Sequence, residues 1–344
     1  MFARNGIKFF DAAGYKLTDD EEDEIESYLD SPRADEIARP TGLEVGRVVA
    51  QDGEEAYAKF LAGTVGERFD GITVVLDCAF GATYRIAPRV FTDLGAKVIA
   101  LHDENDGSRI NVKCGATATQ LLQEAVVKHR AQVGLAYDGD GDRVIAVDEQ
   151  GNVVDGDHIM GICGRQLMAD GKLPHQAIAV TVYSNLGLLE SFREAGGDVV
   201  ITENGDRKVL AAMLERGIKL GGEQSGHVIF LDHNTTGDGI LTSLQLMATM
   251  KRTGKPLSEL KGQIKKFPQL LANVHTPRKN EWKENERIRK VVAGYEAELG
   301  ERGRIFIRAS GTELLIRVMA EGPDEAVLQR IVAEITAVIK EELS

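Results

Sequence analysis

Short runs of β-branched and other apolar residues alternate with segments of helical periodicity through the middle of this chain. In the stretch 71–160, strands are predicted at 72–79, 96–102, 133–138 and 144–149, and helices at 87–95 and 118–130. Gly95 ends the first of these helices, as a glycine stop commonly does. Strands and helices that alternate at this spacing are typical of a parallel sheet covered by helices. We therefore expect an α/β domain here.

The same alternation returns in the stretch 161–256. Strands are predicted at 176–184 and 198–203, helices at 186–196, 209–217 and 238–254, and a glycine-rich loop that leads into a strand at 219–231. The order of the elements is similar in the two stretches, but no residue-level repeat links them. A second α/β domain is expected.

The two ends of the chain have other patterns. A junction rich in proline and charge at 255–284 leads to a helix at 284–299, strands at 304–310 and 314–322, and a helix at 324–343. This pattern predicts a small α+β domain over 257–344. Residues 1–70 hold a short strand at 7–10 and helices at 19–29 and 54–62, which is too little for a separate core. The predicted fold is therefore α/β and multi-domain, with a partial first domain at 1–70.

Composition and charge exclude several classes of protein. The 344 residues carry a formal net charge of −13, whereas a nucleic-acid binder normally has a basic face, so we expect no nucleic-acid partner. No apolar run reaches the roughly 18 residues of a membrane span, and no secretory signal is visible, so no membrane partner is expected. Cys78, Cys114 and Cys163 are too few and too widely spaced for a disulfide framework. A reduced, cytoplasmic protein is expected.

Three carboxylates alternate with glycines between two predicted strands, at Asp138, Asp140 and Asp142. Their side chains can converge in one loop, where each pair of anions about 4 Å apart repels by roughly 1–4 kcal/mol. A hard divalent cation with oxygen ligands would offset that repulsion, so the pattern favours a metal site. A solvated acidic turn is one alternative. An EF-hand loop is another, but Arg143 stands where that loop requires glycine.

A second loop, at 221–227, places polar groups among glycines. Glycines let the backbone approach a ligand, and Glu223 and Ser225 are suited to sugar hydroxyls. A glycine-rich turn with a capping serine would have the same pattern, and His227 would then be a structural histidine.

A third loop, at 308–313, favours phosphate. The amides and hydroxyls of Ser310, Gly311 and Thr312 can form a nest for phosphate oxygens, and Arg308 or Arg317 can bind them with two parallel hydrogen bonds. The alternative is a hairpin turn with a cross-strand ion pair.

The order of these loops resembles the α-D-phosphohexomutase family over essentially the whole chain. The matching motifs are NGIK (5–8), DGDGDR (138–143), GDR (205–207), GEQSGH (222–227) and RASGTE (308–313). DGSRINVKCGAT (106–117) is most similar to the branch of the family that acts on glucosamine phosphates; the branches that act on mannose or glucose phosphates are the alternative. The resemblance implies an isomerase that supplies amino sugars for cell-wall precursors, by intramolecular phosphoryl transfer.

The resemblance also implies roles for individual residues. Asp138, Asp140 and Asp142 would bind Mg²⁺, Arg143 would lie close to the transferred phosphoryl group, and Lys8 would handle a proton at the attacked hydroxyl. Substrate contacts are implied for Glu223, Ser225, His227, Arg207, Arg308, Ser310, Gly311, Thr312 and Arg317. The implied reaction passes through a phosphoserine and a sugar 1,6-bisphosphate, which is both intermediate and activator. The expected partner is a small phosphosugar. The expected assembly is either a monomer or a homodimer.

Some features depart from the family's pattern. Phe80 and Arg109 replace asparagines, and Leu314 replaces a proline. The family keeps its phosphoserine in a Ser-His-Asn-Pro loop shortly before NGIK, and these residues contain no such loop. We therefore expect the 344 residues alone to show no sustained turnover of glucosamine 6-phosphate. A non-catalytic sugar-phosphate-binding protein is the alternative function.

Overall fold

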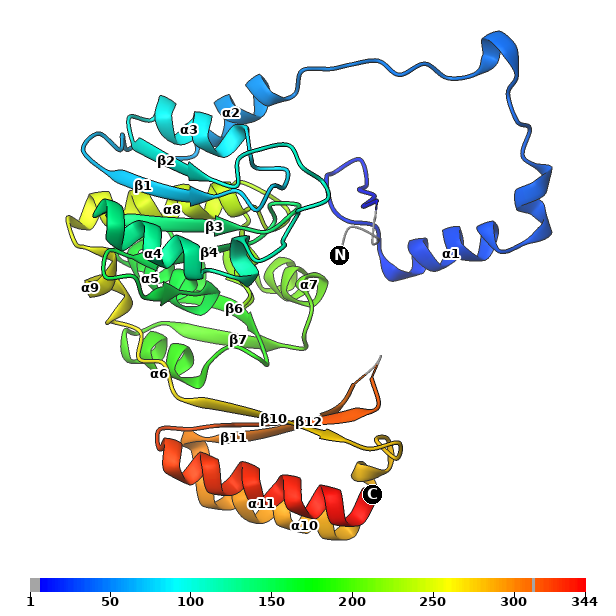
Figure 1. Cartoon of the computed structure of the whole chain (residues 1–344), viewed down its shortest axis with the longest axis vertical. Helices are drawn as coiled ribbons and strands as arrows, with labels where there is room; N and C mark the ends of the chain where they lie inside the picture. The colour runs from blue at the N-terminus through cyan, green and yellow to red at the C-terminus, as the bar shows by residue number, and fades with distance from the viewer. Residues whose placement is uncertain (1–6, 311–312) are drawn as a thin grey trace.

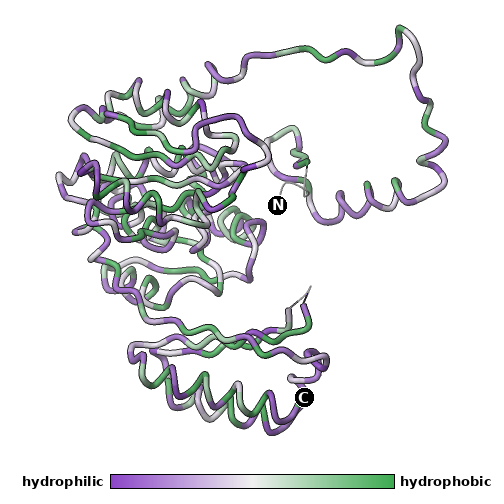
Figure 2. The backbone as a smooth tube through the Cα atoms, in the orientation of Figure 1, coloured by the Kyte–Doolittle hydropathy of each residue, from purple (hydrophilic) through white to green (hydrophobic). Residues whose placement is uncertain are grey.

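The computed structural model describes residues 7–310 and 313–344, which form two bodies and a long N-terminal arm (Figure 1). The larger body contains two sheets with helices between and around them. The smaller body, at the C-terminal end, contains a third sheet with helices on one face. The strands of the larger body are its most hydrophobic segments (Figure 2), as expected where helices cover both faces of a sheet.

The first sheet has the strand order β2-β1-β3-β4-β5. Its strands are β1 (Thr73–Asp77), β2 (Lys97–Leu101), β3 (Val133–Tyr137), β4 (Val144–Asp148) and β5 (Val153–Val154), with helices α2 (Glu54–Gly63), α3 (Ile86–Asp93) and α4 (Gln120–His129). The β1 strand pairs in parallel with β2 and β3, as predicted, but β4 and β5 run antiparallel. Only the loop 138–143 joins β3 to β4, and a parallel pair would need a crossover of a dozen or more residues.

The second sheet has the order β7-β6-β8-β9. This part contains α5 (Gly156–Ala169), β6 (Ala177–Thr181), α6 (Leu186–Glu194), β7 (Asp198–Thr202), α7 (Asp206–Arg216), β8 (Leu220–Gly222), β9 (Val228–Phe230), α8 (Gly239–Thr253) and α9 (Leu257–Lys261). The α8 helix is buried along residues 239–250 and contacts β3, β4, β9 and α5. One hydrophobic core therefore runs through both sheets, and the loops at their edges are held at fixed positions.

The smaller body is the predicted α+β domain. It consists of β10 (Gln269–His275), α10 (Glu286–Leu299), β11 (Arg304–Ala309), β12 (Leu315–Glu321) and α11 (Glu325–Leu343). The sheet is antiparallel with the order β10-β12-β11, and both helices cover the face that points away from the larger body (Figure 1). The opposite face of the sheet is therefore directed toward the larger body.

A buried ion pair joins the two bodies. Arg304 donates from Nε to Glu321 Oε2 at 2.6 Å, and the Glu321 side chain is fully buried. The same guanidinium donates to the carbonyls of Val182 (2.7 Å) and Ser184, and Glu321 Oε1 accepts from the Leu186 amide at 2.8 Å. Both charges on the smaller body thus have backbone partners on the larger one.

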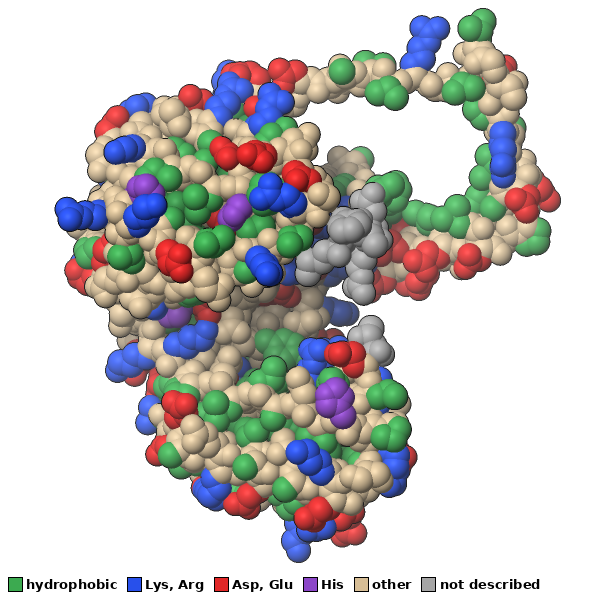
Figure 3. Space-filling model, viewed as in Figure 1, with side chains coloured by type: hydrophobic (Ala, Val, Ile, Leu, Met, Phe, Trp, Pro, Cys, Tyr) green, Lys and Arg blue, Asp and Glu red, His purple; other side chains and the backbone are tan. Residues whose placement is uncertain are grey.

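The N-terminal arm, residues 7–53, is almost wholly exposed (Figure 3). Its first part contacts the larger body through ion pairs of Lys8 with Asp140 and of Lys16 with Asp206, and the rest loops out from that body. Its helix α1 (Asp19–Leu29) begins where predicted, because Thr18 and Glu21 form a capping box. The predicted strand at 7–10 is wrong. Phe10 makes a single bridge to Lys16, because among the described residues no strand lies beside this segment to complete a ladder, and Phe9 is 57% exposed.

Two helices and three strands were not predicted: α5, α9, β5, β8 and β10. The α5 sequence contains Gly156, Gly161 and Gly164, which interrupt its helical periodicity but admit close neighbours such as Ile264 and Phe192. In the described ranges, no helix combines the length and the apolar character that a membrane span requires.

Candidate active site

The loop between β3 and β4, residues 138–143, brings its three aspartates together as predicted. One carboxylate oxygen from each of Asp138, Asp140 and Asp142 lies within 4.8 Å of the others. Asp138 is buried, Asp142 is half-buried and Asp140 is exposed. Two backbone hydrogen bonds of 2.8 Å hold the loop, from the Ala82 amide to the Gly139 carbonyl and from the Gly239 amide to the Gly141 carbonyl. The cluster is therefore anchored to the turn that precedes α3 and to the first residue of α8.

The electrostatics of this aspartate loop call for a cation. Burial, together with the charges of Asp142 and Asp140, raises the pKa of Asp138 to about 6. The Lys8 ammonium lies 2.6 Å from Asp140 Oδ2 and 3.0 Å from Asp142 Oδ2. A cation thus already bridges two of the three carboxylates. An all-oxygen donor set of this kind fits Mg²⁺.

His227 orients the aspartate loop from the side of the second sheet. It is buried, and its Nε2 accepts a hydrogen bond from the Gly237 amide at 3.1 Å. The proton of a neutral ring is therefore on Nδ1, which lies 3.5 Å from Asp142 Oδ2. Burial opposes ionisation of Asp142, but hydrogen bonds from His227 and Lys8 outweigh it and hold the pKa of this carboxyl well below its usual range. In this arrangement His227 contacts an aspartate, and its contact with substrate stays a prediction.

The loop 222–227 lies directly against the aspartate loop. Ser225 Oγ donates to Glu223 Oε2 at 3.0 Å, so these two predicted sugar ligands form one unit. The Val144 amide donates to the Gly226 carbonyl at 3.1 Å and joins the two loops. Gly226 has φ +95°, and a Cβ built there would lie 2.2 Å from the Val144 carbonyl oxygen. Only glycine fits at this position.

Replacing Gly226 by Ala is expected to lower the free energy of unfolding by about 2 kcal/mol or more and to weaken Mg²⁺ binding, because the loops must move apart. Gly171→Ala is the matched control, since Gly171 also has a left-handed φ (+67°) but no atom within 4 Å of the added Cβ. Urea denaturation and calorimetric Mg²⁺ titration measure the two effects. Equal losses in both variants would refute the packing argument.

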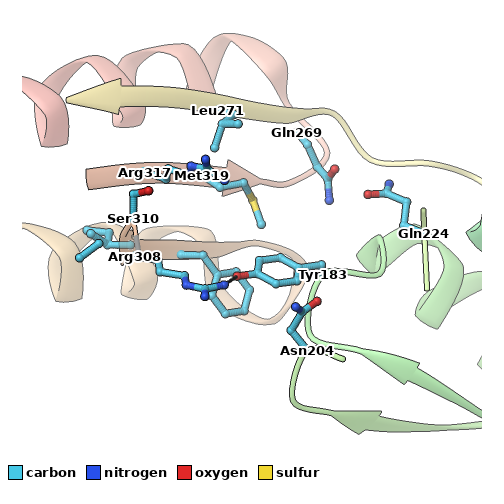
Figure 4. A pocket seen from close by; sticks show the side chains of 12 residues that line it. Tyr183, Asn204, Gln224, Gln269, Leu271, Arg308, Ser310, Arg317 and Met319 are labelled. Carbon is cyan, nitrogen blue, oxygen red and sulfur yellow. Dashed lines mark hydrogen bonds between the residues drawn. The ribbon is translucent and has the colours of Figure 1, made fainter. Parts of the chain in front are cut away.

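A cavity of about 880 Å³ lies between the two bodies (Figure 4). Side chains of the larger body, including Tyr183, Asn204 and Gln224, form one wall, and Arg308, Ser310 and Arg317 belong to the opposite wall. Gln224 comes from the loop 222–227, so this loop reaches the same cavity as the predicted phosphate loop, although the predicted sugar ligands Glu223 and Ser225 are not among the residues that line it. Of the predicted phosphate residues, Gly311 and Thr312 lie outside the described residues.

Arg308 and Arg317 are directly opposite each other on β11 and β12. Residues paired in this way project from the same face of a sheet, where two like charges destabilise the strand pair. Arg308 donates to the Tyr183 hydroxyl at 3.2 Å, and Arg317 forms a long ion pair of 3.5 Å with the exposed Glu313. An anion between the two guanidinium groups would relieve this repulsion.

Arg143 and Arg207 are two further residues that the sequence predicted to belong to the site. Arg143 Nε lies 3.9 Å from Asp138 Oδ2 and 3.8 Å from Asp142 Oδ1, beside the aspartate loop. Arg207 lies at the start of α7 and forms ion pairs with Asp19 and Glu22 of α1, away from the residues that line the cavity. Its contact with substrate stays a prediction.

Lys8 is not poised to accept a proton in this arrangement. Burial alone would lower its pKa, but the hydrogen bonds and charges of Asp140 and Asp142 raise the pKa well above its usual value. The ammonium therefore acts as a counter-ion here, and its role in proton handling stays a prediction.

The sequence interpretation missed several cavity residues: Tyr183, Asn204, Gln224, Gln269 and Phe306. A signal existed for Tyr183 and Asn204, because each follows the carboxyl end of a parallel strand, where α/β sheets bind their ligands. Gln224 lies within the loop 222–227, whose motif was recognised through its neighbours Glu223 and Ser225. Gln269 and Phe306 depend on how the smaller body docks, which no local pattern indicates.

Most of the chain matches known protein families. Three domain families described as phosphoglucomutase/phosphomannomutase match it: the α/β/α domain II at residues 55–151, the α/β/α domain III at 155–267 and the C-terminal domain at 271–338. A structure from this family of Burkholderia thailandensis superimposes with a TM-score of 0.75 at 21% identity, covering 95% of this chain and 72% of that one. The N-acetylphosphoglucosamine mutase of Aspergillus fumigatus, in complex with GlcNAc-6P and magnesium, has a TM-score of 0.69 at 19% identity over 85% of this chain and 66% of that one.

Curated relatives are much closer in sequence. The phosphoglucosamine mutase of Brevibacillus brevis is 48% identical over 343 residues, which is 99% of this chain and 76% of the relative. That of Symbiobacterium thermophilum is 50% identical over 340 residues, 98% of this chain and 76% of the relative. With the phosphohexomutase fold and this degree of identity, the chain belongs to the phosphoglucosamine mutase family.

Proposed function

We propose that these residues bind the metal and the phosphosugar for an intramolecular phosphotransferase that interconverts glucosamine 6-phosphate and glucosamine 1-phosphate. One observation carries the assignment of sites: the facing pair Arg308 and Arg317 lines the same cavity as Gln224 of the loop 222–227. An anion-binding wall opposite a hydroxyl-binding loop is what a sugar phosphate requires.

The aspartate loop would hold Mg²⁺, which when bound would offset negative charge on the transferring phosphoryl group. The chain's own residues fix the loop around it. His227 Nδ1 lies 3.5 Å from Asp142 Oδ2, the Arg143 amide donates to Asp138 Oδ1 at 3.1 Å, and the Arg143 guanidinium adds positive charge beside both carboxylates. These contacts set the positions of the donor oxygens before any ligand arrives.

The cavity would fix the phosphate that is not being transferred. Arg308, Arg317 and Ser310 would bind its oxygens, while Glu223 and Ser225 hold sugar hydroxyls, so that the reacting oxygen is presented to the metal loop. A sugar 1,6-bisphosphate carries a phosphate at each end, and after turning end over end it would place either one in the arginine wall. The sugar 1,6-bisphosphate would therefore serve as both intermediate and activator. The proposed assembly of the chain is a homodimer, which light scattering tests.

Arg317→Gln is expected to weaken binding of glucosamine 6-phosphate roughly 10- to 100-fold, the effect of losing charge-assisted hydrogen bonds. Without ligand, the same change is expected to leave the melting temperature unchanged or raised, because it removes one of two facing cations. Isothermal titration calorimetry and thermal denaturation measure the two effects.

Arg330→Gln is the control for this experiment, since Arg330 lies on α11, is exposed to a similar extent and pairs with Glu298. It is expected to bind glucosamine 6-phosphate with unchanged affinity. If the Arg317 variant binds as tightly as the control, the phosphate is not held by this wall.

A further inference from the structure

A second group of metal-binding side chains lies outside the aspartate loop. Asp77 ends β1, His102 follows β2, and Cys114 precedes a short turn at residues 115–117. One donor atom from each lies within 4.8 Å of the others. Asp77 and Cys114 are fully buried, and the His102 side chain is 19% exposed. Three distant parts of the sequence thus converge at one edge of the first sheet.

The donor set distinguishes this group from the aspartate loop. A thiolate, an imidazole and a carboxylate are the ligands that zinc prefers, whereas Mg²⁺ prefers oxygen alone. His102 Nδ1 and Asp77 Oδ1 are 2.9 Å apart, close to the roughly 3.3 Å that separates two ligand atoms of a tetrahedral zinc ion. Small side-chain movements would bring all three donors to zinc distance.

A purely structural role explains Asp77 but not Cys114. Asp77 accepts from the amides of Ala79 (3.0 Å) and Gly115 (2.9 Å), so its carboxylate is well supplied with donors. The Cys114 thiol donates a weak hydrogen bond of 4.0 Å to the Arg109 carbonyl, and its sulfur is close to the backbone amides of Asn111 and Val112. The same sulfur lies within 4.8 Å of a donor atom of Asp77 and of His102, where it can serve as a metal ligand.

The backbone around the group is strained. Among the described residues, five of the eight non-glycine residues with left-handed φ belong to these segments: Ala79, Phe80, His102, Asn111 and Lys113. Each such conformation costs of the order of 1 kcal/mol or more and persists where other interactions over-determine it. Strain concentrated on the segments that carry the three donors points to a constraint at this place.

Two residues that differ from the family pattern cover the group. The Phe80 ring packs on the His102 ring with centroids 4.9 Å apart, and the Arg109 guanidinium lies 3.9 Å from the centre of the Phe80 ring. They shield one side of the imidazole, and the remaining exposed part of His102 gives an ion a route from solvent.

We propose that Asp77, His102 and Cys114 form a zinc site with three protein ligands, separate from the magnesium site at Asp138, Asp140 and Asp142. Zinc binding releases the thiol proton to solvent and leaves one coordination position for water. The segment 106–117 packs on the aspartate loop, where a Cβ on Gly139 would lie 2.4 Å from Ile110. A zinc ion would therefore clamp this segment and support the magnesium loop.

Cobalt(II) titration of the 344-residue chain tests the site, because only a cobalt–thiolate bond gives strong charge-transfer absorption in the near ultraviolet. The band is expected to saturate at one equivalent of Co²⁺, to disappear on addition of Zn²⁺ and to persist in excess Mg²⁺. It is expected to be absent in Cys114→Ala and retained in Cys163→Ala, a control at another buried cysteine. No band in the parent chain, or a band retained in Cys114→Ala, overturns the proposal.

A second variant keeps the test decisive if Cys114→Ala does not fold. His102→Asn keeps the thiol and places at φ +51° a residue that tolerates left-handed backbone. Its Co²⁺ dissociation constant is expected to rise by at least 10- to 100-fold. An unchanged constant would remove His102 from the ligand set and overturn the site as proposed. Asp140→Asn is expected to keep the full band, which separates this site from the aspartate loop.

Discussion

Replacing Asp140 by Asn is expected to lower the Mg²⁺ affinity of the chain roughly 100-fold, and Mg²⁺-dependent phosphoglucosamine mutase turnover by about 10²- to 10³-fold. Asp140 is the most exposed of the three aspartates, and its carboxylate contacts the Lys8 ammonium. The change therefore removes one ligand charge without leaving a buried group unsatisfied. Calorimetry measures the affinity on this chain, and a coupled assay measures turnover in an enzyme that joins these residues to a phosphoserine loop.

The control is Asp232→Asn. Asp232 is exposed to the same degree as Asp140 (58% against 56% of the side chain) and also pairs with a lysine, Lys219, at 2.8 Å. Its loss is expected to change neither Mg²⁺ affinity nor turnover. Retention of tight Mg²⁺ binding by Asp140→Asn would show that the ion does not use the aspartate loop as a three-carboxylate site.

Glu321→Ala is expected to destabilise the smaller body by about 3–5 kcal/mol, because it leaves Arg304 charged, largely buried and unpaired and takes the acceptor from the Leu186 amide. The only tryptophan of the sequence, Trp282, packs against the core of the smaller body. Tryptophan fluorescence during urea denaturation therefore reports on this unit specifically.

Glu298→Ala is the matched comparison within the same unit. Glu298 and Arg330 form an ion pair in which both side chains are nearly half exposed, so the loss is expected to stay below about 1 kcal/mol. The cavity between the bodies should also lose affinity for glucosamine 6-phosphate in Glu321→Ala alone. Similar urea midpoints for the two glutamate variants would mean that the Arg304–Glu321 pair does not hold the bodies together.

Local pattern predicted the elements whose residues carry a clear periodicity. The strands β1, β3 and β6 are short, buried and rich in β-branched or other apolar residues, and the helix predicted at 19–29 matches α1. The helix α5 was not predicted, because its glycines allow close packing against other elements, and this requirement is not visible in the local sequence pattern. The antiparallel pairing of β4 with β3 could have been predicted, because the loop 138–143 is too short for a parallel crossover.

The candidate site likewise has features that the local sequence predicts and features that depend on how separate elements pack. The three aspartates lie within one short loop and alternate with glycines, so their convergence could be predicted from that loop alone. The pairing of Arg308 with Arg317 depends on the strand register, and the contact of His227 with Asp142 depends on how the two sheets pack. Interactions between separate elements of this kind leave no mark on either segment alone.

The contact of Lys8 with Asp140 and Asp142 makes the N-terminal arm a tethered competitor for the metal ion. A tethered ammonium has an effective concentration set by the chain that carries it, so it lowers the apparent metal affinity without changing the ligands themselves. By reciprocity, a bound ion displaces Lys8 and loosens the arm. Occupancy of the aspartate loop by a metal ion is thereby linked to the position of the N-terminal arm, which ion pairs with Asp206 and Arg207 also attach to α7.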